Sequence, residues 1–316
     1  MRRAAPPDSK PEPVDAQRRL AARILRIHLG ERPRRLQPLG GGLTNQVFRL
    51  ETKGRSYVVR LHDDEAKLAD YHKEEWAMAQ ARGVDVPTPG VLAIGVERKR
   101  PFMILEEVRG IPATHWSEPA SVLRQLGECA ARLHSVHTQG FGRAIGTGQL
   151  LGPALWPNWA EFLDNELRLR ERLQLLDRMQ LLPASAREQL DTVLEEMRGW
   201  RRRPALQHGD LRLKNVMVSP TDGRIVALLD WEDCLSAPPP FWDLAIALHD
   251  LGPDEKEAFL EGYELSPGQF ERMVPVLRVL NLLNYAWAIG QASGDGQRQR
   301  VAWLKARLRG AFDVAL

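Results

Sequence analysis

The sequence of 316 residues contains very little cysteine. Its two cysteines, Cys129 and Cys234, lie far apart in the chain and show no paired spacing. Neither a disulfide framework nor a cysteine-based metal site is therefore indicated, and a reducing, cytoplasmic location is expected.

The chain also lacks the marks of membrane insertion and of secretion. No apolar run approaches the length that a bilayer crossing requires, so no membrane partner is expected. Residues 1–15 are rich in proline, alanine and charge, but they contain neither an apolar core segment nor a small-residue cleavage site. We expect them to form a flexible tail rather than a secretory signal.

The chain also has no large excess of positively or negatively charged residues. The 44 lysines and arginines and the 41 acidic residues give a formal net charge of +3, and basic stretches such as residues 18–35 and 201–203 are typical of solvated helix faces. A nucleic-acid partner is therefore not expected. Hydrophobic residues (43%) and charged residues (27%) occur at ordinary globular levels, in a chain long enough for two lobes.

The first of these lobes is expected over residues 16–108 and should be rich in strands. Short β-branched and aromatic stretches predict the strands, and Leu20, Ile24 and Ile27 recur at helical spacing. The predicted elements are helices at 17–29 and 66–82 and strands at 46–51, 56–61, 91–96 and 102–107.

The second lobe, residues 109–316, is expected to be mostly helical and to carry the catalytic loop. Its predicted helices are separated by a short strand-rich interruption between Leu206 and Asp233. These helices are at 119–137, 159–179, 184–200, 241–251, 254–263, 267–290 and 298–312.

Unusual polar residues concentrate in the interruption. His208-Gly209-Asp210 is followed five positions after Asp210 by Asn215, and the apolar strand 225–229 then ends at Asp230. A hairpin can bring Asn215 and Asp230 onto one metal ion while Asp210 faces elsewhere. Phosphoryl transfer needs such parts, namely oxygen ligands for Mg²⁺ and a carboxylate that accepts the proton of the attacking hydroxyl. Turn capping is the competing interpretation of either aspartate alone, but it explains both together with Asn215 less well, and His208 is better explained as a core histidine that orients the loop.

At these residues the sequence resembles the aminoglycoside phosphotransferase and choline kinase-like family. The family signature is His-Gly-Asp, four variable residues and Asn, with a later Asp-Trp or Asp-Phe. The resemblance covers about Leu36 to the C-terminus and implies an α+β, protein-kinase-like fold with a β-rich N-lobe and a helical C-lobe. It also implies that Asp210 is the catalytic base or an orienting carboxylate, that Asn215 and Asp230 bind Mg²⁺, and that Asp243 supports the catalytic loop.

The resemblance extends to a nucleotide site in the first lobe, with ATP or GTP as the donor. Residues 40–45 resemble the loop that covers the nucleotide, with Gly41, Gly42, Thr44 and Asn45 near phosphate, although a glycine triplet before a hairpin is more often a plain turn. Arg60 occupies the place of the strand lysine that contacts the α- and β-phosphates.

Two further positions complete the nucleotide site. Glu74 is the expected helix partner of Arg60, with Glu75 as the competing choice. The backbone of residues 105–108, through Glu106 and Val108, is expected to bind the purine, although its apolar core is equally consistent with an edge strand.

The acceptor is the least determined part of the site. Glu232 and Asp233 could line an acidic mouth for a cationic acceptor, but scattered acids are more often solvated surface. Gly140-Phe141-Gly142 and Trp159-Ala-Glu-Phe-Leu resemble the hygromycin-type branch of the family. The expected acceptor is a hydroxyl of a sugar, an aminocyclitol or aminoglycoside, or an amino alcohol. A nucleotide-binding scaffold without turnover and a metal-dependent phosphohydrolase are the competing hypotheses.

Overall fold

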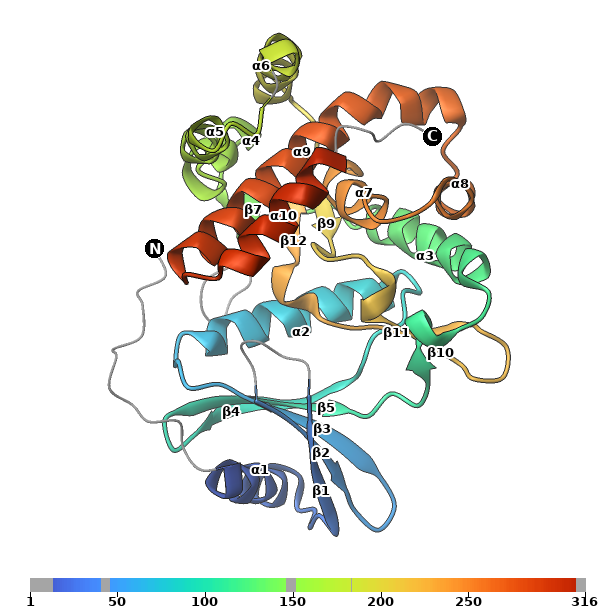
Figure 1. Ribbon diagram of the computed structural model, residues 1–316. Coiled ribbons are helices and arrows are strands. Elements are labelled where there is room, and N and C mark those ends of the chain that lie inside the picture. The colour runs from blue at the N-terminus through green and yellow to red at the C-terminus, as the bar shows by residue number, and fades with distance from the viewer. Residues whose placement is uncertain (1–13, 41–45, 146–151, 183, 311–316) are drawn as a thin grey trace. The chain divides into compact units, whose positions relative to one another are not determined.

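The computed structural model describes residues 14–40, 46–145, 152–182 and 184–310. The chain forms two compact units (Figure 1), of which unit 1 contains residues up to Met78 together with Thr88–Arg109. Unit 2 contains Ala79–Pro87 and the chain from Gly110 onward. The change of unit at Arg109 lies one residue from the lobe boundary expected from the sequence, whereas residues 79–87 group with the second unit.

Unit 1 is built on one five-stranded antiparallel sheet with the strand order β1-β2-β3-β5-β4. Its central hairpin pairs Gln46 with Leu61 and Glu51 with Ser56, and the alternation of buried and less buried side chains along β3 follows the period of two of a strand. The strands are β1 (Arg35–Leu39), β2 (Gln46–Glu51), β3 (Ser56–Leu61), β4 (Val91–Glu97) and β5 (Arg100–Glu106).

The core of unit 1 lies between this sheet and α1 (Val14–Leu29). Leu20, Ala21, Ile24 and Leu25 are buried on one face of α1, which packs against the first three strands (Figure 1). The sheet contributes the other buried residues of this core, which are Phe48, Leu50, Tyr57, Val59, Leu61, Phe102 and Ile104. The second helix, α2 (Lys67–Gly83), follows β3.

Unit 2 is mostly helical and contains two small antiparallel sheets. One sheet has the order β11-β10-β6 and the other β8-β7-β12-β9. The strands are β6 (Ile111–Pro112), β7 (Phe141–Ile145), β8 (Ala154–Trp156), β9 (Ala205–Gln207), β10 (Val216–Val218), β11 (Ile225–Leu228) and β12 (Leu235–Ala237).

The helices of unit 2 follow the predicted order. They are α3 (Pro119–Leu133), α4 (Trp159–Glu161), α5 (Leu169–Arg178), α6 (Ala184–Arg198), α7 (Phe241–Ala247), α8 (Pro253–Gly262), α9 (Pro267–Gly294) and α10 (Arg298–Gly310). Short 3₁₀ turns lie at Ala113–His115, Leu213–Asn215 and Trp231–Asp233.

The helix predicted over 159–179 is wrong as a single element. After α4 the chain forms a π-helical turn at Phe162–Glu166, and Arg168 then adopts a left-handed backbone with φ of 54°. This conformation breaks the ladder of backbone hydrogen bonds, so α5 starts as a new helix at Leu169.

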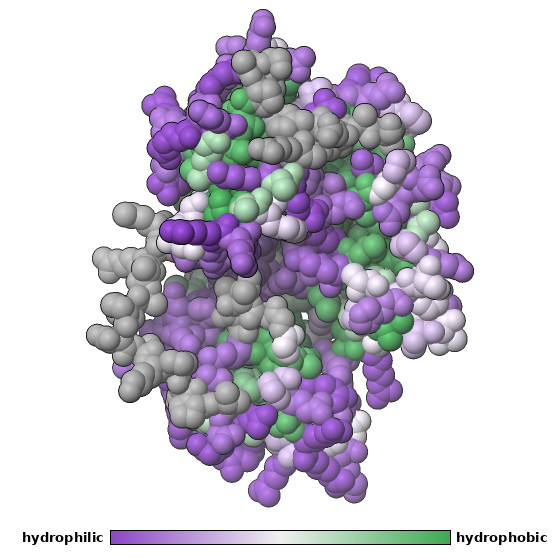
Figure 2. All heavy atoms as spheres, viewed as in Figure 1, coloured by the Kyte–Doolittle hydropathy of each residue, from purple (hydrophilic) through white to green (hydrophobic). Residues whose placement is uncertain are grey.

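The helix α9 is the longest element of unit 2 and is largely apolar. By length and composition alone it could span a membrane, so the expectation that no apolar stretch reaches that length is wrong for this helix. Half of its apolar window is buried inside the structure, where α9 packs against α5, α7 and α10. The core helix of a globular unit passes the same test, and hydrophilic residues cover most of the face shown in Figure 2.

Candidate active site

The loop between β9 and β10 carries the His-Gly-Asp motif and is held by one buried carboxylate. Asp243, in the first turn of α7, is fully buried, and its two oxygens accept the backbone N–H groups of His208 and Gly209, both at 2.8 Å. The Asp243 N–H in turn donates to Oε1 of Gln207 at 3.0 Å. The support that the sequence assigned to Asp243 is therefore present as three hydrogen bonds.

His208 connects this loop to the end of β11. Its ring is buried, its Nδ1 accepts the N–H of Asp210 at 3.3 Å, and its Nε2 donates to the carbonyl oxygen of Leu229 at 3.0 Å. The ring also packs against the buried indole of Trp231, with 4.6 Å between centroids. Both ring nitrogens are engaged with backbone groups, which agrees with an orienting role for His208.

Gly209 is required by the close approach of two loops. Its φ is +85°, and a Cβ added there would lie 2.0 Å from the carbonyl oxygen of Asp233. Only glycine accepts this backbone without moving the turn after Asp230.

Asp210 stands at the centre of a charged cluster. Its carboxylate lies 3.0 Å from Nε of Arg212 and 2.8 Å from Nζ of Lys214, and it accepts Nδ2 of Asn215 at 3.0 Å. Burial alone would raise the pKa of this carboxyl, but Lys214, Arg212 and Asn215 together hold the pKa below its ordinary value. Asp210 is therefore ionised at neutral pH, as a proton acceptor must be.

The β10–β11 hairpin brings Asn215 and Asp230 to the same end. Val216 pairs with Leu228, and the N–H of Leu229 donates to the carbonyl oxygen of Asn215 at 2.8 Å. Asp230 follows with a left-handed φ of 63°, at an exposed position. Because Asn215 uses its Nδ2 on Asp210, its amide oxygen remains as an acceptor, so the pair offers the hard oxygen donors that suit Mg²⁺.

No cluster of three or more His, Cys, Asp and Glu side chains suited to a metal occurs in the part of the chain that the structure describes. An Asn–Asp pair is too small to form such a cluster. A site of this kind depends on phosphate oxygens and water for the other ligands of Mg²⁺.

Two residues that support the Asp243 carboxylate, His134 and Tyr263, were not predicted from the sequence. Nε2 of the buried His134 donates to the Asp243 carboxylate at 3.1 Å, and Nδ1 of the same ring lies 2.8 Å from the hydroxyl of Tyr263. Burial and the Asp243 charge raise the pKa of Tyr263, so its hydroxyl stays protonated and can donate. No local motif marks either residue.

Unit 1 carries the ion pair expected around Arg60. Arg60 on β3 is bound by Glu74 on α2, with 2.5 Å between Nη1 and Oε2, and the Glu74 side chain is fully buried. The competing Glu75 is half exposed and lies 3.6 Å from His72 instead. The Arg60 guanidinium also lies 5.3 Å from the ring centre of Tyr71. Arg60 is therefore paired with Glu74 rather than with Glu75, while the nucleotide-binding role of this pair stays a prediction.

Replacing Glu74 with alanine should lower the free energy of unfolding by about 3 kcal/mol, because it leaves the Arg60 charge without its buried partner. Urea denaturation measures this change. The matched control is Glu75→Ala, which should change stability by less than about 0.5 kcal/mol because that side chain is half exposed. Equal effects of the two substitutions would contradict the assignment.

The segment expected to bind a purine follows the end of β5. The N–H of Glu106 donates to Gly90 at 2.8 Å and that of Glu107 to Ser56 at 3.3 Å. The backbone N–H groups of Glu106 and Glu107 are thus engaged within the chain. The N–H group of Val108 is the one in this segment that we assign to a purine. The predicted phosphate-covering residues, Gly41, Gly42, Thr44 and Asn45, lie outside the described residues.

The acidic residues expected to bind a cationic acceptor are Glu232 and Asp233, and a neighbouring arginine partly neutralises them. Asp233 is exposed, and its Oδ1 lies 3.7 Å from Nε of Arg143. Arg143 also lies 3.8 Å from Glu166 and 5.2 Å from the ring centre of Trp242. Glu232 lies one residue before Asp233 in the same turn. The Arg143 guanidinium therefore lies beside Asp233, one of the two acids expected to bind a cationic acceptor.

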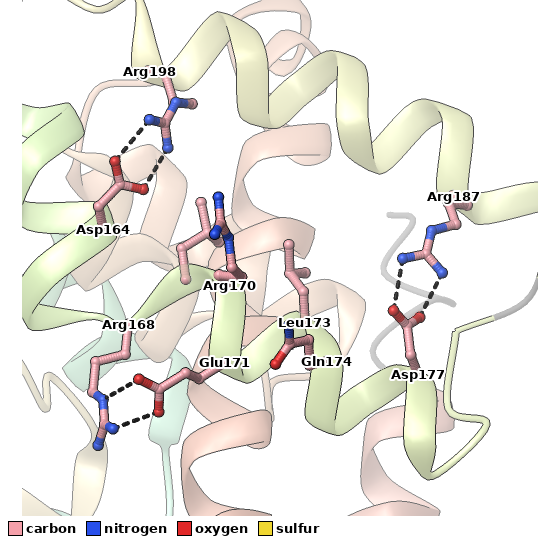
Figure 3. A pocket seen from close by; sticks show the side chains of 10 residues that line it. Asp164, Arg168, Arg170, Glu171, Leu173, Gln174, Asp177, Arg187 and Arg198 are labelled. Carbon is pink, nitrogen blue, oxygen red and sulfur yellow. Dashed lines mark hydrogen bonds and ion pairs between the residues drawn. The ribbon is translucent and has the colours of Figure 1, made fainter.

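A cavity in unit 2 lies apart from these groups. It measures about 700 Å³ and is lined by residues of the π-helical turn, α5 and α6. Figure 3 shows that six of its charged side chains pair with one another as Arg198–Asp164, Arg187–Asp177 and Arg168–Glu171. None of the predicted site residues lines it. We therefore place the candidate site at the loop of Asp210.

Curated relatives were found by sequence comparison. The chain is 29% identical over 210 residues to acyl-CoA dehydrogenase family member 11 of Rattus norvegicus, covering 60% of this chain and 25% of that protein. It thus spans about a quarter of that relative. It is 26% identical over 266 residues to a probable ketoamine kinase of Vibrio parahaemolyticus, covering 80% of this chain and 86% of that protein.

Solved structures share the fold. The aminoglycoside phosphotransferase APH(4)-Ia, in a ternary complex with ADP and hygromycin B, superimposes with a TM-score of 0.70 at 20% identity, covering 92% of this chain and 97% of that chain. The GDP complex of aminoglycoside 2′-phosphotransferase-IIIa gives a TM-score of 0.66 at 15% identity, covering 91% and 95%. The α+β, kinase-like fold expected from the sequence is confirmed.

The family is established by a match that spans most of the chain. Residues 35–280 match the model of the phosphotransferase enzyme family, and this range contains both the Arg60–Glu74 pair and the loop of Asp210. The chain therefore belongs to the phosphotransferase enzyme family and has the fold of the aminoglycoside phosphotransferases.

Proposed function

We propose that the protein transfers the γ-phosphoryl group of ATP or GTP, with Mg²⁺, to a hydroxyl of a small molecule. The observation that carries this proposal is the loop of Asp210. Asp243 fixes the loop backbone, and the loop presents an ionised carboxylate directly beside Asn215.

Asp210 is the group to which we assign the proton of the acceptor. As the acceptor oxygen bonds to the γ-phosphorus, the bond to the β-phosphate oxygen breaks and the hydroxyl proton passes to the Asp210 carboxylate. The Asn215 amide at 3.0 Å and the Lys214 ammonium at 2.8 Å hold that carboxylate in place before the acceptor arrives.

Asn215 and Asp230 are the residues that would hold Mg²⁺, because they supply its preferred oxygen ligands from one end of a hairpin. When bound, the ion neutralises negative charge that develops on the phosphates. In unit 1, the Arg60 guanidinium, held by Glu74, is assigned to the α- and β-phosphates, and the backbone of Glu106 and Val108 to the purine.

Two competing functions are less well supported. A nucleotide-binding scaffold without turnover leaves the combination of Asp210, Asn215 and Asp230 unexplained. A metal-dependent phosphohydrolase gives no purpose to the buried Arg60–Glu74 pair.

The proposal is tested by nucleotide consumption with ATP or GTP and Mg²⁺ on a panel of sugars, ketoamine-modified sugars, aminoglycosides, choline and amino alcohols. Ketoamine-modified sugars and aminoglycosides are included because related and structurally similar proteins bear those names. We expect acceptor-dependent consumption and a phosphorylated product. Nucleotide hydrolysis that no acceptor stimulates would favour the phosphohydrolase.

Replacing Asp230 with alanine should weaken Mg²⁺-dependent nucleotide binding at least about tenfold, since one of two protein ligands is lost. Titration of the nucleotide at varied Mg²⁺, followed by calorimetry, measures this. The control is Asp222→Ala, an exposed acid in the turn of the same hairpin, which should bind as the original protein does. Unchanged affinity of the Asp230 variant would show that the metal assignment is wrong.

A further inference from the structure

One arginine of unit 2, Arg143, has no role in the proposed transfer although it lies close to the loop of Asp210. Arg143 belongs to β7, and β7 pairs with β12 through Gly142 and Ser236. The strand β12 begins two residues after Asp233, which ends the 3₁₀ turn that follows Asp230. The strand that carries Arg143 is therefore fixed to the segment that follows this turn.

The Arg143 guanidinium is held in place without a hydrogen bond. Its centre lies 5.2 Å from the ring centre of Trp242, and the carboxylates of Glu166 and Asp233 are 3.8 Å and 3.7 Å away. The Glu166 oxygens are already used, because they accept the backbone N–H of Arg143 and Nε1 of Trp156, both at 3.0 Å. Within the described part of the chain, the buried Nε of Arg143 has no hydrogen-bond partner. This planar donor group is therefore oriented but unused.

Asp233 supplies acceptor atoms at the same place. Its side chain is 52% exposed and that of Arg143 is 32% exposed, so a ligand can reach both from solvent. The 3.7 Å between Nε and Oδ1 is an ion-pair distance but is too long for a hydrogen bond. The two side chains, which we call the Arg143–Asp233 pair, therefore keep donors and acceptors available for a ligand.

The Arg143–Asp233 pair lies next to the loop that carries the proposed base. A Cβ added to Gly209 would lie 2.0 Å from the carbonyl oxygen and 3.1 Å from Cβ of Asp233, and Gly209 directly precedes Asp210. The turn of Asp233 and the loop of Asp210 are thus in direct contact. An acceptor that approaches Asp210 along this turn meets the pair as well.

The two opposite charges of the pair select among classes of acceptor. A carboxylate or a phosphate ester would be attracted by Arg143 but repelled by Asp233, and an ammonium group would experience the reverse. A hydroxyl both donates and accepts, so one hydroxyl can donate to Asp233 while its neighbour accepts from Arg143. The pair is therefore complementary to neighbouring hydroxyl groups of an uncharged molecule.

We propose that the Arg143–Asp233 pair recognises the acceptor by two neighbouring hydroxyl groups, and that Arg143 makes the site prefer a neutral polyol to an amino sugar. This inference rests on the proposed function and names the acceptor class of the same site. Arg143 is a specificity-determining residue in this arrangement, because it orients the acceptor and takes no part in the transfer of the phosphoryl group.

The first test measures sugar binding to the full chain without turnover, by ligand-observed NMR titration. The probes are three matched pairs, namely glucose and glucosamine, galactose and galactosamine, and myo-inositol and an aminodeoxyinositol. At least one neutral member should bind at least about fivefold more tightly than its amino partner. Arg143→Met should remove this preference, because Asp233 is left to attract the ammonium, whereas Arg143→Lys keeps the charge and should keep the preference.

Two further variants make this test decisive. Asp233→Asn, at an exposed position, should increase the preference for the neutral sugar at least about threefold, because it removes the charge that attracts an ammonium. Arg224→Met, in the exposed turn between β10 and β11, is the matched control and should bind as the original protein does. The absence of binding by every neutral sugar, or a preference that neither Arg143→Met nor Asp233→Asn changes, would overturn the proposal.

The second test uses the best acceptor of the panel and its analogues that lack one hydroxyl next to the phosphorylated one. At least one such deoxy analogue should have an at least about tenfold lower kcat/KM with the original protein. With Arg143→Met the same analogue should lose less than about twofold, because the partner of that hydroxyl is already absent. Equal losses in the two proteins would overturn the proposal. If no acceptor stimulates nucleotide consumption, the proposed function fails, and the sugar titrations still decide what Arg143 recognises.

Discussion

Replacing Asp210 with alanine should reduce the turnover number on the best acceptor by about 10²- to 10⁴-fold, while nucleotide affinity changes by less than about threefold. The reason is that Asp210 acts on the acceptor hydroxyl, whereas the groups assigned to the nucleotide are Asn215 and Asp230 here and Arg60 in unit 1. Single-turnover transfer and calorimetric nucleotide binding measure the two quantities separately.

The informative companion of this variant is Asp210→Asn. It keeps the shape of the side chain and its contact with Asn215, but it removes the negative charge that Lys214 and Arg212 hold in the ionised form. A loss of turnover similar to that of the alanine variant would show that the charge matters rather than the packing. Turnover equal to that of the original protein in both variants would exclude Asp210 as the base.

The strands of unit 1 show how far local pattern predicts this fold. The bounds of β2 and β3 agree with the prediction, because both have alternating side chains and a clear turn between them. The strand β1 was not predicted. Its sequence, Arg35–Leu39, contains Pro38 and no buried residue, which suits an edge strand but gives no alternating pattern.

The break before α5 illustrates a different limit. Arg168 adopts a left-handed backbone that glycine or asparagine would have signalled, and arginine does not. The preceding Glu166 accepts the N–H of Arg143 and Nε1 of Trp156, both at 3.0 Å. These partners lie 23 and 10 residues away in the sequence, so tertiary contacts rather than local propensity accompany the change of direction.

In the candidate site, residues carried by a motif were predictable and their supporting partners were not. The choice of Glu74 over Glu75 agrees with helix periodicity, because Tyr71, Glu74 and Met78 share the buried face of α2. His134 and Tyr263 have no such signal. His134 lies 109 positions from Asp243 and 129 positions from Tyr263, and only the folded chain brings the three side chains together.

The second large effect is expected at Asp243, whose carboxylate is buried and accepts three hydrogen bonds from His208, Gly209 and His134. Asp243→Asn replaces one acceptor oxygen with an NH₂ group that faces donors. We expect a loss of about 3 kcal/mol in the free energy of unfolding, together with a loss of transfer because the loop of Asp210 is released. Urea denaturation and acceptor-dependent turnover measure the two effects.

The pH dependence of stability distinguishes this role from a simple packing defect. Burial alone would raise the pKa of Asp243, but the hydrogen bond from His134, with further help from His208, holds the pKa below its ordinary value of 3.8. The stabilisation from this carboxylate is therefore fully present above about pH 4 and is lost as the pH falls further, through the lowered pKa. Asp243→Asn should flatten this acid limb. Tyr263→Phe, which removes only the hydroxyl that contacts His134, should lower stability by about 1 kcal/mol and keep the acid limb. An unchanged acid limb in Asp243→Asn would show that Asp243 is not ionised in the folded protein and that other groups hold the loop.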